Sequence, residues 1–367
     1  MNDDTLYAVA LNMLPHVGAT SARLLMGFYR TAKEVFSLSR GELNRIFGKR
    51  DDVIEAIANG EVLRRAEAEL QFAEKKHIRV LLHSDDDFPR RLNEEDCVDA
   101  PTVLFYAGKA NLNATRALAV VGTRKATSYG QDVVARLLAD LAKEEVLVVS
   151  GLALGIDTCA HTFSMKNGLP TVAVVAHGLD RIYPPLNRNL AARMLQEDAG
   201  IITEYPSGTP ISPGQFPARN RIIAGMVDGV LVVEASATGG ALITANLAAG
   251  YHREVLAVPG RIGDKYSEGC NRIIANSKAL LVESGDDVLH ALGWERRSTR
   301  VQQQKLPLQL SADEEKIMAV LRGQDEVTMN EIIAKSGLPI ATLSSLLFEL
   351  ELKSLCRCLP GRKYKML

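Results

Sequence analysis

The chain of 367 residues lacks most of the features that mark secreted, membrane-spanning or disulfide-stabilised proteins. It has five cysteines, with no CxxC pair and no disulfide-like spacing, as is typical of a reducing cytosol. It has no run of eighteen apolar residues, and its N-terminus has no basic region followed by an apolar core. We therefore expect a cytoplasmic protein with no membrane partner.

The chain also lacks an excess of either charge, with 43 lysines and arginines against 44 aspartates and glutamates. A nucleic-acid-binding protein of this composition must gather its basic residues locally. The GxGxxG run of dinucleotide-binding proteins is missing, which argues against a dehydrogenase. The histidines show no ligand spacing with one another or with cysteine, so we predict neither a metal nor a cofactor.

Three regions with different sequence patterns predict the domain organisation. Residues 1–75 carry apolar residues at three- and four-residue spacing, which predicts a helical domain. Residues 76–293 begin with a strand-like segment at 78–82 and an aspartate-rich loop, and then alternate short β-branched runs with helical stretches. Residues 294–310 are polar and glutamine-rich, so we expect a linker before a last domain at 311–367.

The middle region predicts the fold class. Its strand candidates are short and lack polar alternation, so they are expected to be buried on both faces, as parallel strands are. Their alternation with helices predicts an α/β fold with an extended Rossmann-like, doubly wound, mostly parallel sheet, whose ligands bind at the carboxyl ends of the strands. The expected strands are residues 117–121, 146–150, 171–175, 200–204, 229–234, 254–259 and 279–283.

The last region predicts a winged helix. Three helical stretches follow Ser311, which forms a capping-box pattern with Glu314, and two short strands close the chain around a Pro-Gly pair at 360–361. The segment from Lys353 to Leu367 contains five basic residues and no acidic one. We interpret it either as a wing that contacts DNA or as part of a dimerising or protein-docking module.

The loop after the first of the parallel strands, VVGTRKATSYG, has features of a phosphate site. It places Gly122, Thr123, Arg124 and Lys125 at the start of a helix, where free N–H groups and the helix dipole attract anions. The alternative is an ordinary βα turn with solvated charges.

The next strand-end loop is SGLALGIDTCAHTFS, in which Ser150, Gly151 and Gly155 allow close approach of a backbone. Asp157 and His161 lie four residues apart on one face of the helix that follows. They either polarise a water molecule or cap and pin the loop. We favour the structural role, because no nucleophile or acidic partner stands nearby in the sequence.

The segment FPARNRIIAG places an aromatic ring and two arginines at the start of an apolar helix, as Phe216, Arg219, Asn220 and Arg221. Guanidinium groups bind phosphate in a bidentate manner, and an aromatic ring can stack on any base. The cluster therefore suits a single strand of nucleic acid. The alternative is a helix start whose arginines pair with acidic neighbours such as Glu204.

Two further strand-end loops extend this set. Gly239 and Gly240 open a helix in EASATGGALITA, and the loop VPGRIGDKYSEGCN carries Arg261 and Lys265. A small-molecule site needs only two or three such loops, whereas a polymer could use all of them.

These motifs together resemble the DNA-processing protein A family (DprA, also called Smf). VVGTRKATSYG, SGLALGIDTCAH, FPARNRIIAG, VVEASATGGALITA and VPG…SEGCN occur in the family's order and spacing over about residues 75–290. LPHVGATSARLL (14–25) is similar to a helix-hairpin-helix turn, in keeping with the helical, SAM-like N-terminal domain of the family, which often ends in a winged helix.

The resemblance implies a non-enzymatic protein. Members of this family bind single-stranded DNA during natural transformation, displace or tolerate single-strand-binding protein, and load the RecA recombinase. They work as homodimers joined through the sheet domain and need neither nucleotide nor metal. The resemblance therefore implies these partners and this assembly for the present chain.

Carried over residue by residue, the resemblance assigns the DNA backbone contacts to Arg124, Arg219 and Arg221, and the stacking on a base to Phe216. Relatives can carry a lysine just before the FPxRNR stretch, whereas PISPGQ has none. The basic residues of the 258–271 loop would then have to substitute for it.

Two other classes of protein are alternatives. The sheet and its loops are similar to nucleoside-monophosphate phosphoribohydrolases related to lysine-decarboxylase-like proteins, which carry a PGGxGTxxE run. Here SATGGALITAN has no glutamate at that offset, and Glu234 could serve only from the strand. The other alternative is a pure interaction protein that docks through its winged helix. In either case the segment 271–281 is a candidate for part of a dimer surface, or else an ordinary core helix.

Overall fold

A computed structural model describes residues 3–48, 50–295, 310–322, 326–353, 355–359 and 363–366. The chain divides into two compact units, Met1–Arg297 and Ser298–Leu367, and each is described by itself. Most of the expected linker, residues 296–309, lies outside the described residues.

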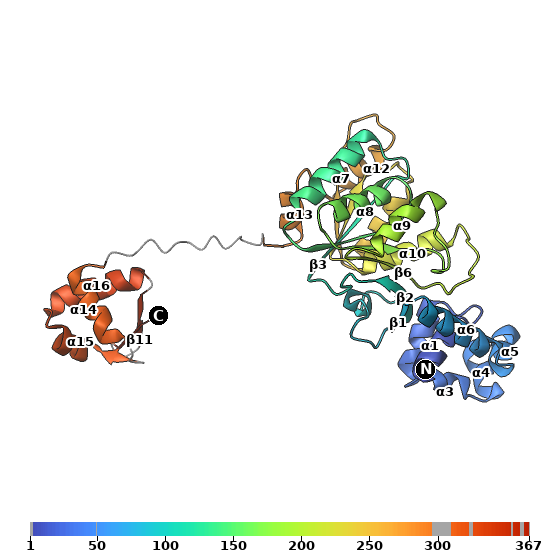
Figure 1. Ribbon diagram of the computed structural model, residues 1–367, viewed down its shortest axis with the longest axis horizontal. Coiled ribbons are helices and arrows are strands. Elements are labelled where there is room, and N and C mark those ends of the chain that lie inside the picture. Colours follow the sequence, from blue (N-terminus) through green and yellow to red (C-terminus); the bar gives the residue numbers. More distant parts are fainter. Residues whose placement is uncertain are drawn as a thin grey trace. The chain divides into compact units, whose positions relative to one another are not determined.

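The first unit is built on a nine-stranded sheet with the order β1-β2-β6-β5-β4-β3-β7-β8-β9 (Figure 1). Strands β3 to β9 pair in parallel, whereas β2 runs antiparallel to β6 and β1 antiparallel to β2. The expected α/β fold class is therefore confirmed. The strands are β1 (Arg79–Leu82), β2 (Val103–Gly108), β3 (Arg116–Gly122), β4 (Val146–Ser150), β5 (Thr171–Val174), β6 (Ala199–Thr203), β7 (Gly229–Val233), β8 (Glu254–Ala257) and β9 (Leu280–Leu281).

Strand β2 has no counterpart among the strands expected from the sequence. It follows an aspartate-rich segment, and no α-helix separates it from β1, so the βαβ pattern does not include it. Tertiary packing explains its place. Val103 and Phe105 pack against the N-terminal helices, while Leu104 and Tyr106 on the opposite face join the core of the sheet.

Helices cover both faces of the sheet: α7 (Ser128–Asp140), α8 (Ile156–Lys166), α9 (Arg188–Met194), α10 (Gln215–Gly225), α11 (Gly240–Gly250), α12 (Glu268–Ala275) and α13 (Gly285–Ala291). Alternate residues of β3 show the two layers. Ala119 and Val121 pack into the core that contains α10 and α11, whereas Leu118 and Val120 pack with α7, α8 and α13. Burial on both faces is the reason these strands show no polar alternation.

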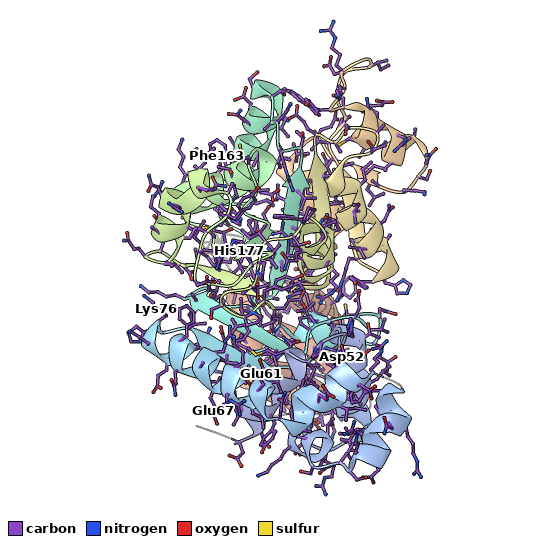
Figure 2. The ribbon with its side chains drawn as sticks, turned by 90° about the vertical axis from the view of Figure 1, so that its right-hand side faces the viewer. Asp52, Glu61, Glu67, Lys76, Phe163 and His177 are labelled. Carbon is purple, nitrogen blue, oxygen red and sulfur yellow. The ribbon has the colours of Figure 1, made fainter. Side chains whose placement is uncertain are left out.

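The N-terminal region forms the expected helices, which share one hydrophobic core. That core continues onto one face of β1 and β2, so the helices expected at 1–75 belong to the same compact unit as the sheet. Figure 2 shows α6, marked by the labels Glu61 and Glu67, beside this pair of strands. The helices are α1 (Asp3–Asn12), α2 (Ala19–Phe28), α3 (Ala32–Phe36), α4 (Arg40–Phe47), α5 (Asp51–Ala58) and α6 (Glu61–Lys75).

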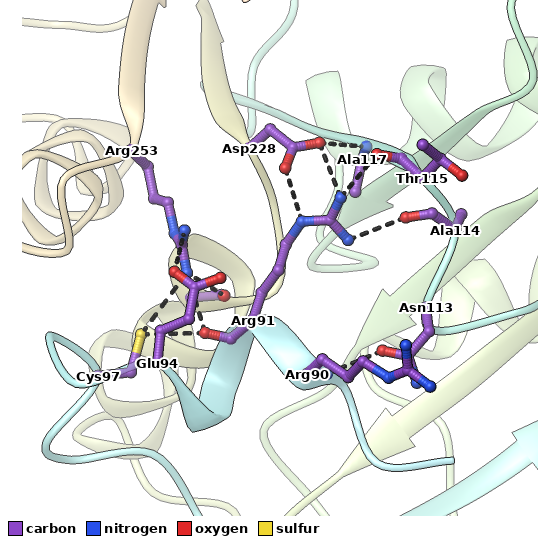
Figure 3. A network of polar contacts seen from close by, with 11 residues as sticks. Arg90, Arg91, Glu94, Cys97, Asn113, Ala114, Thr115, Ala117, Asp228 and Arg253 are labelled. Atoms are coloured by element: carbon purple, nitrogen blue, oxygen red, sulfur yellow. Dashed lines mark hydrogen bonds and ion pairs between the residues drawn. The ribbon is translucent and has the colours of Figure 1, made fainter. Parts of the chain in front are cut away.

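A polar clamp ties the segment between β1 and β2 to the amino ends of the central strands (Figure 3). Arg91, in the 3-10 turn η1 (Arg90–Asn93), binds both carboxylate oxygens of Asp228 at 2.7 and 2.9 Å. Asp228 in turn accepts the backbone N–H of Ala117 at 2.8 Å. Arg253 donates to Glu94 at 2.7 Å and to the carbonyl of Arg91. These contacts hold the amino-terminal ends of β3 and β7, opposite to the strand ends that carry the predicted ligand loops.

The second unit has the helices and strands of a winged helix. Its elements are α14 (Ala312–Leu321), β10 (Val327–Thr328), α15 (Met329–Ser336), α16 (Ile340–Leu352), β11 (Cys356–Leu359) and β12 (Lys363–Met366), and the sheet order is β10-β12-β11. The capping box of Ser311 and Glu314 is present as expected. The Pro-Gly pair at 360–361 lies outside the described residues.

Within the described ranges, no single helix is long and apolar enough to cross a membrane. Among the helices that the structure describes, one bent pair, α15 and α16, reaches that length and composition together, across a bend of 110°. Both contribute side chains to the core of the winged helix, Ile332 from the first and Leu343 from the second.

Candidate nucleic-acid interface

A cavity of about 510 Å³ opens at the carboxyl ends of the central strands. In the sheet, β4, β5 and β6 follow one another on one flank of β3, whereas β7, β8 and β9 follow one another on its other flank. The chain therefore turns in opposite directions after β3 and after β7, and the two loops diverge. Four of the predicted loops meet there. The predicted residues that line the cavity are Gly122, Thr123, Arg124, Phe216, Arg219, Asn220, Gly239 and Gly240.

Among the described residues that line this cavity are one exposed cation and two aromatic rings. The guanidinium carbon of Arg124 lies 5.4 Å from the centroid of the Phe216 ring. The Tyr183 ring lies 5.7 Å from the Phe216 ring, with 47° between their planes. Arg124 is exposed, and none of the ion pairs found among the described residues involves it. Its charge is therefore available to a ligand.

Tyr183 is a site residue that the sequence reasoning missed. It belongs to the loop after β5, and 41% of its surface is exposed. Buried His177, labelled in Figure 2, holds this loop: its Nδ1 donates to the carbonyl of Gly178 at 2.9 Å, and its Nε2 accepts the N–H of Tyr183 at 3.1 Å. Burial lowers the pKa of His177, so the ring stays neutral and can accept. The available signal was an aromatic residue beside two prolines in a strand-end loop.

Glu234 fixes the loop that carries Arg124. Its backbone carbonyl accepts the N–H of Thr123 at 2.8 Å, and its carboxylate accepts both the N–H of Thr127, at 2.9 Å, and the Thr127 hydroxyl. Glu234 itself has a positive φ of 58°, which turns the chain sharply at the end of β7. The one glutamate that a phosphoribohydrolase could have used from this strand is thus engaged in shaping the neighbouring loop.

The glycines of the site serve two different purposes. Gly155 has a φ of 80°, and a Cβ there would overlap the carbonyl of Thr123 and the backbone of Arg124. It therefore lets two loops of the protein approach one another, and not a ligand as the sequence suggested. At Gly240, by contrast, a Cβ would meet no described atom within 4 Å. The first turn of α11 is accordingly open to the cavity.

Arg219 requires a correction to the expected phosphate contact. Only 5% of its surface is exposed, and its Nη1 donates to the carbonyl of Gly151 at 2.7 Å and to the carbonyl of Val174. Burial lowers its pKa to about 10, so it remains charged at neutral pH. Arg219 forms the floor of the cavity and has little surface to offer a phosphate.

Ser150 and Gly151, expected to face DNA, are buried as well. The Ser150 hydroxyl donates to the carbonyl of Val120 at 2.7 Å. The N–H of Gly151 donates to Asp157, and a Cβ at Gly151 would collide with the Arg219 guanidinium. Ser150 and Gly151 therefore pack beneath the cavity and do not face it.

Arg221 forms an ion pair with Glu204. This is the alternative given from the sequence, in which the arginines at this helix start pair with acidic neighbours. Both side chains are nearly buried, and Arg221 does not line the cavity. Burial raises the pKa of Glu204, while the Arg221 charge lowers it. Asn220 does line the cavity, and its side-chain oxygen accepts from Nε of Arg219 at 3.2 Å.

Asp157 and His161 do not act on each other, which agrees with the structural role favoured from the sequence. Asp157 accepts the N–H groups of Gly151 and Ala153, both at 3.2 Å, and so pins the loop after β4. His161 is fully buried, with Nδ1 2.8 Å from the hydroxyl of Thr171.

Arg261 and Lys265 lie at a second, separate cavity of about 720 Å³. Thr127 and Glu234 also line it, and both basic side chains are exposed. The structure thus does not bring Arg261 and Lys265 into the first cavity. Lys125 lies beside Arg124 and is exposed, but it lines neither of these cavities.

The arrangement is suited to binding. The first cavity presents an exposed guanidinium, two rings and the amino end of α11, whose first N–H groups attract anions. Among the described residues, no group of three histidine, cysteine, aspartate or glutamate side chains is placed to hold a metal ion. A phosphate could lie between Arg124 and α11, and a base could stack on Phe216 or Tyr183.

The fold and this cavity define a Rossmann-like protein with an aromatic and basic site at its topological switch point. The family model for DNA recombination-mediator protein A matches residues 79–293, and that for the DprA winged helix domain matches residues 302–362. The chain therefore belongs to the DNA recombination-mediator protein A family.

Individual relatives agree with this assignment. The chain is 43% identical to the DNA processing protein DprA of Streptococcus pneumoniae over 205 residues, which is 56% of this chain and 71% of that one. It is 33% identical to the protein Smf of Escherichia coli over 80% of this chain and 79% of that one.

Two solved structures are also similar. The X-ray structure of DNA processing protein A from S. pneumoniae has a TM-score of 0.66 and 34% identity, covering 79% of this chain and 98% of that one. DNA processing protein A from Helicobacter pylori, described as having a unique single-stranded DNA binding mode, has a TM-score of 0.52 and 26% identity, covering 59% and 95%.

Proposed function

We propose that this protein binds single-stranded DNA in the cavity at the ends of β3 and β7. The observation that carries the proposal is the exposed Arg124 guanidinium 5.4 Å from the Phe216 ring, at the same opening as the first turn of α11. Such a site takes a phosphate and an unstacked base together, which a single strand offers and a duplex does not. The H. pylori relative, described as binding single-stranded DNA, supports the choice of ligand.

In this proposal the residues have distinct roles. Arg124 and the amino end of α11 hold the DNA backbone, while Phe216 and Tyr183 stack on bases. Glu234 and Gly155 position the Arg124 loop, and Arg219 supports the floor. Lys125, Arg261 and Lys265 contact the strand beyond the first cavity.

We further propose that the protein is a non-enzymatic recombination mediator. It would protect incoming single strands during natural transformation, act alongside single-strand-binding protein, and transfer the strand to the RecA recombinase. Membership of the DNA recombination-mediator protein A family supports this role.

The protein would act as a homodimer through the edge of its sheet. Strand β9 pairs with β8 on one side only, and its residues Leu280 and Leu281 are 50% and 46% exposed. An exposed edge strand offers unpaired N–H and C=O groups that a second chain can pair with. It lies within the segment 271–281 that the sequence indicated.

The test is equilibrium binding of a labelled oligonucleotide, single- or double-stranded, over a series of salt concentrations. Wild type should prefer the single strand, and affinity should fall steeply with salt. Arg124→Ala should weaken binding for every sequence and reduce the salt slope by about one. Lys143→Ala is the matched control. This exposed lysine precedes β4, so it lies at the amino-terminal ends of the strands, whereas the cavity lies at their carboxyl ends.

Unchanged affinity of Arg124→Ala would reject the site, and absence of single-strand binding at moderate salt would reject the function. In the second case, release of free base from AMP by the same preparation would indicate the phosphoribohydrolase alternative. Stimulation of RecA filament formation on strands coated with single-strand-binding protein tests the mediator role separately.

A further inference from the structure

The winged helix differs from DNA-reading modules at its third helix, α16. In a helix-turn-helix the helix at this position enters the major groove and contacts bases and phosphates. The sequence of α16, IATLSSLLFELEL, contains two glutamates and neither lysine nor arginine. A helix of this composition would be repelled by phosphates.

The positive charge of the wing region is partly neutralised within the unit. Lys353 donates to Glu314 at 2.5 Å, and Lys363 to Glu326 at 2.9 Å. Two of the five basic residues counted in the sequence are therefore paired with carboxylates and are not free to hold a phosphate. Of the two interpretations drawn from the sequence, protein docking is the one that these contacts favour.

The exposed face of α16 has large apolar side chains at both ends and small ones between them. Ile340 and Phe348 are 60% and 61% exposed, and Ser344 lies midway between them. Spacings of four and eight residues place all three on one side of the helix. The Ser344 hydroxyl donates to the carbonyl of Ile340 at 2.9 Å, so it can leave water without losing its hydrogen bond.

We propose that this face binds the same face of a second copy of the chain, with the two α16 helices antiparallel. In that arrangement Ser344 lies on the two-fold axis, where its small side chain lets the helices approach closely. Phe348 of each copy then packs on Ile340 of the other. Within one helix these two residues are about 12 Å apart along the axis, at 1.5 Å per residue. One patch therefore complements itself, as a two-fold interface requires.

The charges of the helix are complementary in the same arrangement. Glu351 follows Phe348 on this side. Its Oε1 accepts the backbone N–H of Cys358 at 3.0 Å, which leaves Oε2 for the amino end of the partner helix, where rotation about Ser344 brings this residue. There the helix begins after Pro339, and no side-chain cap is found among the described residues. A carboxylate at uncapped amino-terminal N–H groups is favourable, whereas the two Glu351 side chains stay at opposite ends of the pair.

The experiment is disulfide trapping in the full-length chain. Cysteine is placed on the axis by Ser344→Cys, in a background where the exposed Cys358 is replaced by serine. Mild oxidation with diamide should link two chains through position 344, read on a non-reducing gel. The matched control is Lys335→Cys in the same background, which puts an exposed cysteine on α15 and not on α16.

We expect linking at 344 to exceed linking at 335 by at least tenfold, and Phe348→Asp to lower it by about tenfold, as loss of a buried aromatic anchor does. Far-ultraviolet circular dichroism checks that each variant is folded. Equal linking at the two positions, or linking insensitive to Phe348→Asp, overturns the proposal. It is also overturned if an oligonucleotide protects the thiol introduced by Ser344→Cys from alkylation in the Arg124→Ala background, because the face would then bind DNA.

Discussion

The guanidinium of Arg219 is buried against the loop after β4, where it donates to the carbonyl of Gly151 at 2.7 Å. In the sequence Arg219 stands beside Phe216 and has the same appearance as a ligand-binding arginine. In the fold it joins α10 to the ends of β4 and β5, because its second acceptor is the carbonyl of Val174. The arginine that offers its charge to solvent at this cavity is Arg124.

Replacing Arg219 should therefore cost stability before it affects binding. In Arg219→Ala the nearby buried carboxylate of Asp157 loses its compensating charge, and two carbonyls lose a donor. We expect the free energy of unfolding to fall by about 3–5 kcal/mol. Urea denaturation measures it, with Arg124→Ala as the control, which should change stability by no more than about 0.5 kcal/mol. If both variants are as stable as wild type, the supporting role of Arg219 is wrong.

The two rings should contribute to binding without sequence preference. Phe216→Leu and Tyr183→Leu are each expected to weaken single-strand binding by about 1–3 kcal/mol, because each removes one stacking surface. Phe216→Tyr keeps the ring and should bind as wild type does. Fluorescence anisotropy with oligo-dT and a mixed sequence measures these changes. A loss seen with only one of the two sequences would contradict stacking as the cause.

Alanine substitutions at Gly155 and Gly240 should have different effects on stability, because the first glycine is packed against backbone and the second faces open space. Gly155→Ala introduces a Cβ that overlaps the Thr123 carbonyl, at a φ of 80° that side chains rarely adopt. Its free energy of unfolding should fall by at least about 1–3 kcal/mol. Gly240→Ala meets no described atom within 4 Å and should be neutral or stabilising by up to about 1 kcal/mol. Urea denaturation of both variants is the measurement, and equal effects would contradict the assignment.

His161 should make the protein less stable in acid. Burial, with a further contribution from the charge of Arg219, lowers the pKa of His161 to about 3, against about 6.5 in the unfolded chain. Between these values the unfolded state binds one more proton, so the free energy of unfolding decreases as pH falls, by up to about 1.4 kcal/mol per pH unit.

The check is urea denaturation between pH 7 and 4.5 for wild type, His161→Asn and His290→Asn. The asparagine at 161 can still donate to Thr171, and its pH slope should be smaller by about one proton. His290→Asn is the control, because it removes an exposed histidine by the same substitution. An unchanged slope in His161→Asn would show that this histidine is not the source of the acid sensitivity.

Charges on the edge strand should weaken the proposed homodimer. In Leu281→Asp a carboxylate replaces an apolar side chain at the open edge of β9, and the dimer dissociation constant should rise at least tenfold, which corresponds to about 1.4 kcal/mol. Light scattering after gel filtration over a dilution series measures it. Val98→Asp is the control, because Val98 is also exposed, at 63%, but lies outside the edge strand. Equal masses for wild type and Leu281→Asp at every dilution would remove β9 from the interface.

Several features of the fold followed from local sequence patterns. The apolar runs without alternation predicted buried parallel strands, and the Ser311–Glu314 pattern predicted a capping box that the structure contains. These features depend on neighbours within a few residues, so they can be recognised along the chain. Strand β2 could not be found in this way, because its partner β6 lies almost a hundred residues later and its burial comes from the N-terminal helices.

By itself, the sequence determined the fold class and which loops meet at the carboxyl end of the sheet, because the order of strands and helices fixes that edge. Only the tertiary structure decided which residues of those loops are available. Arg219 finds its acceptors 45 and 68 residues away, Arg221 finds Glu204, and Tyr183 comes to lie beside Phe216. Burial and charge compensation are set by residues far apart in the chain. Three arginines that look alike in the sequence therefore become a buried support, half of an ion pair and an exposed cation.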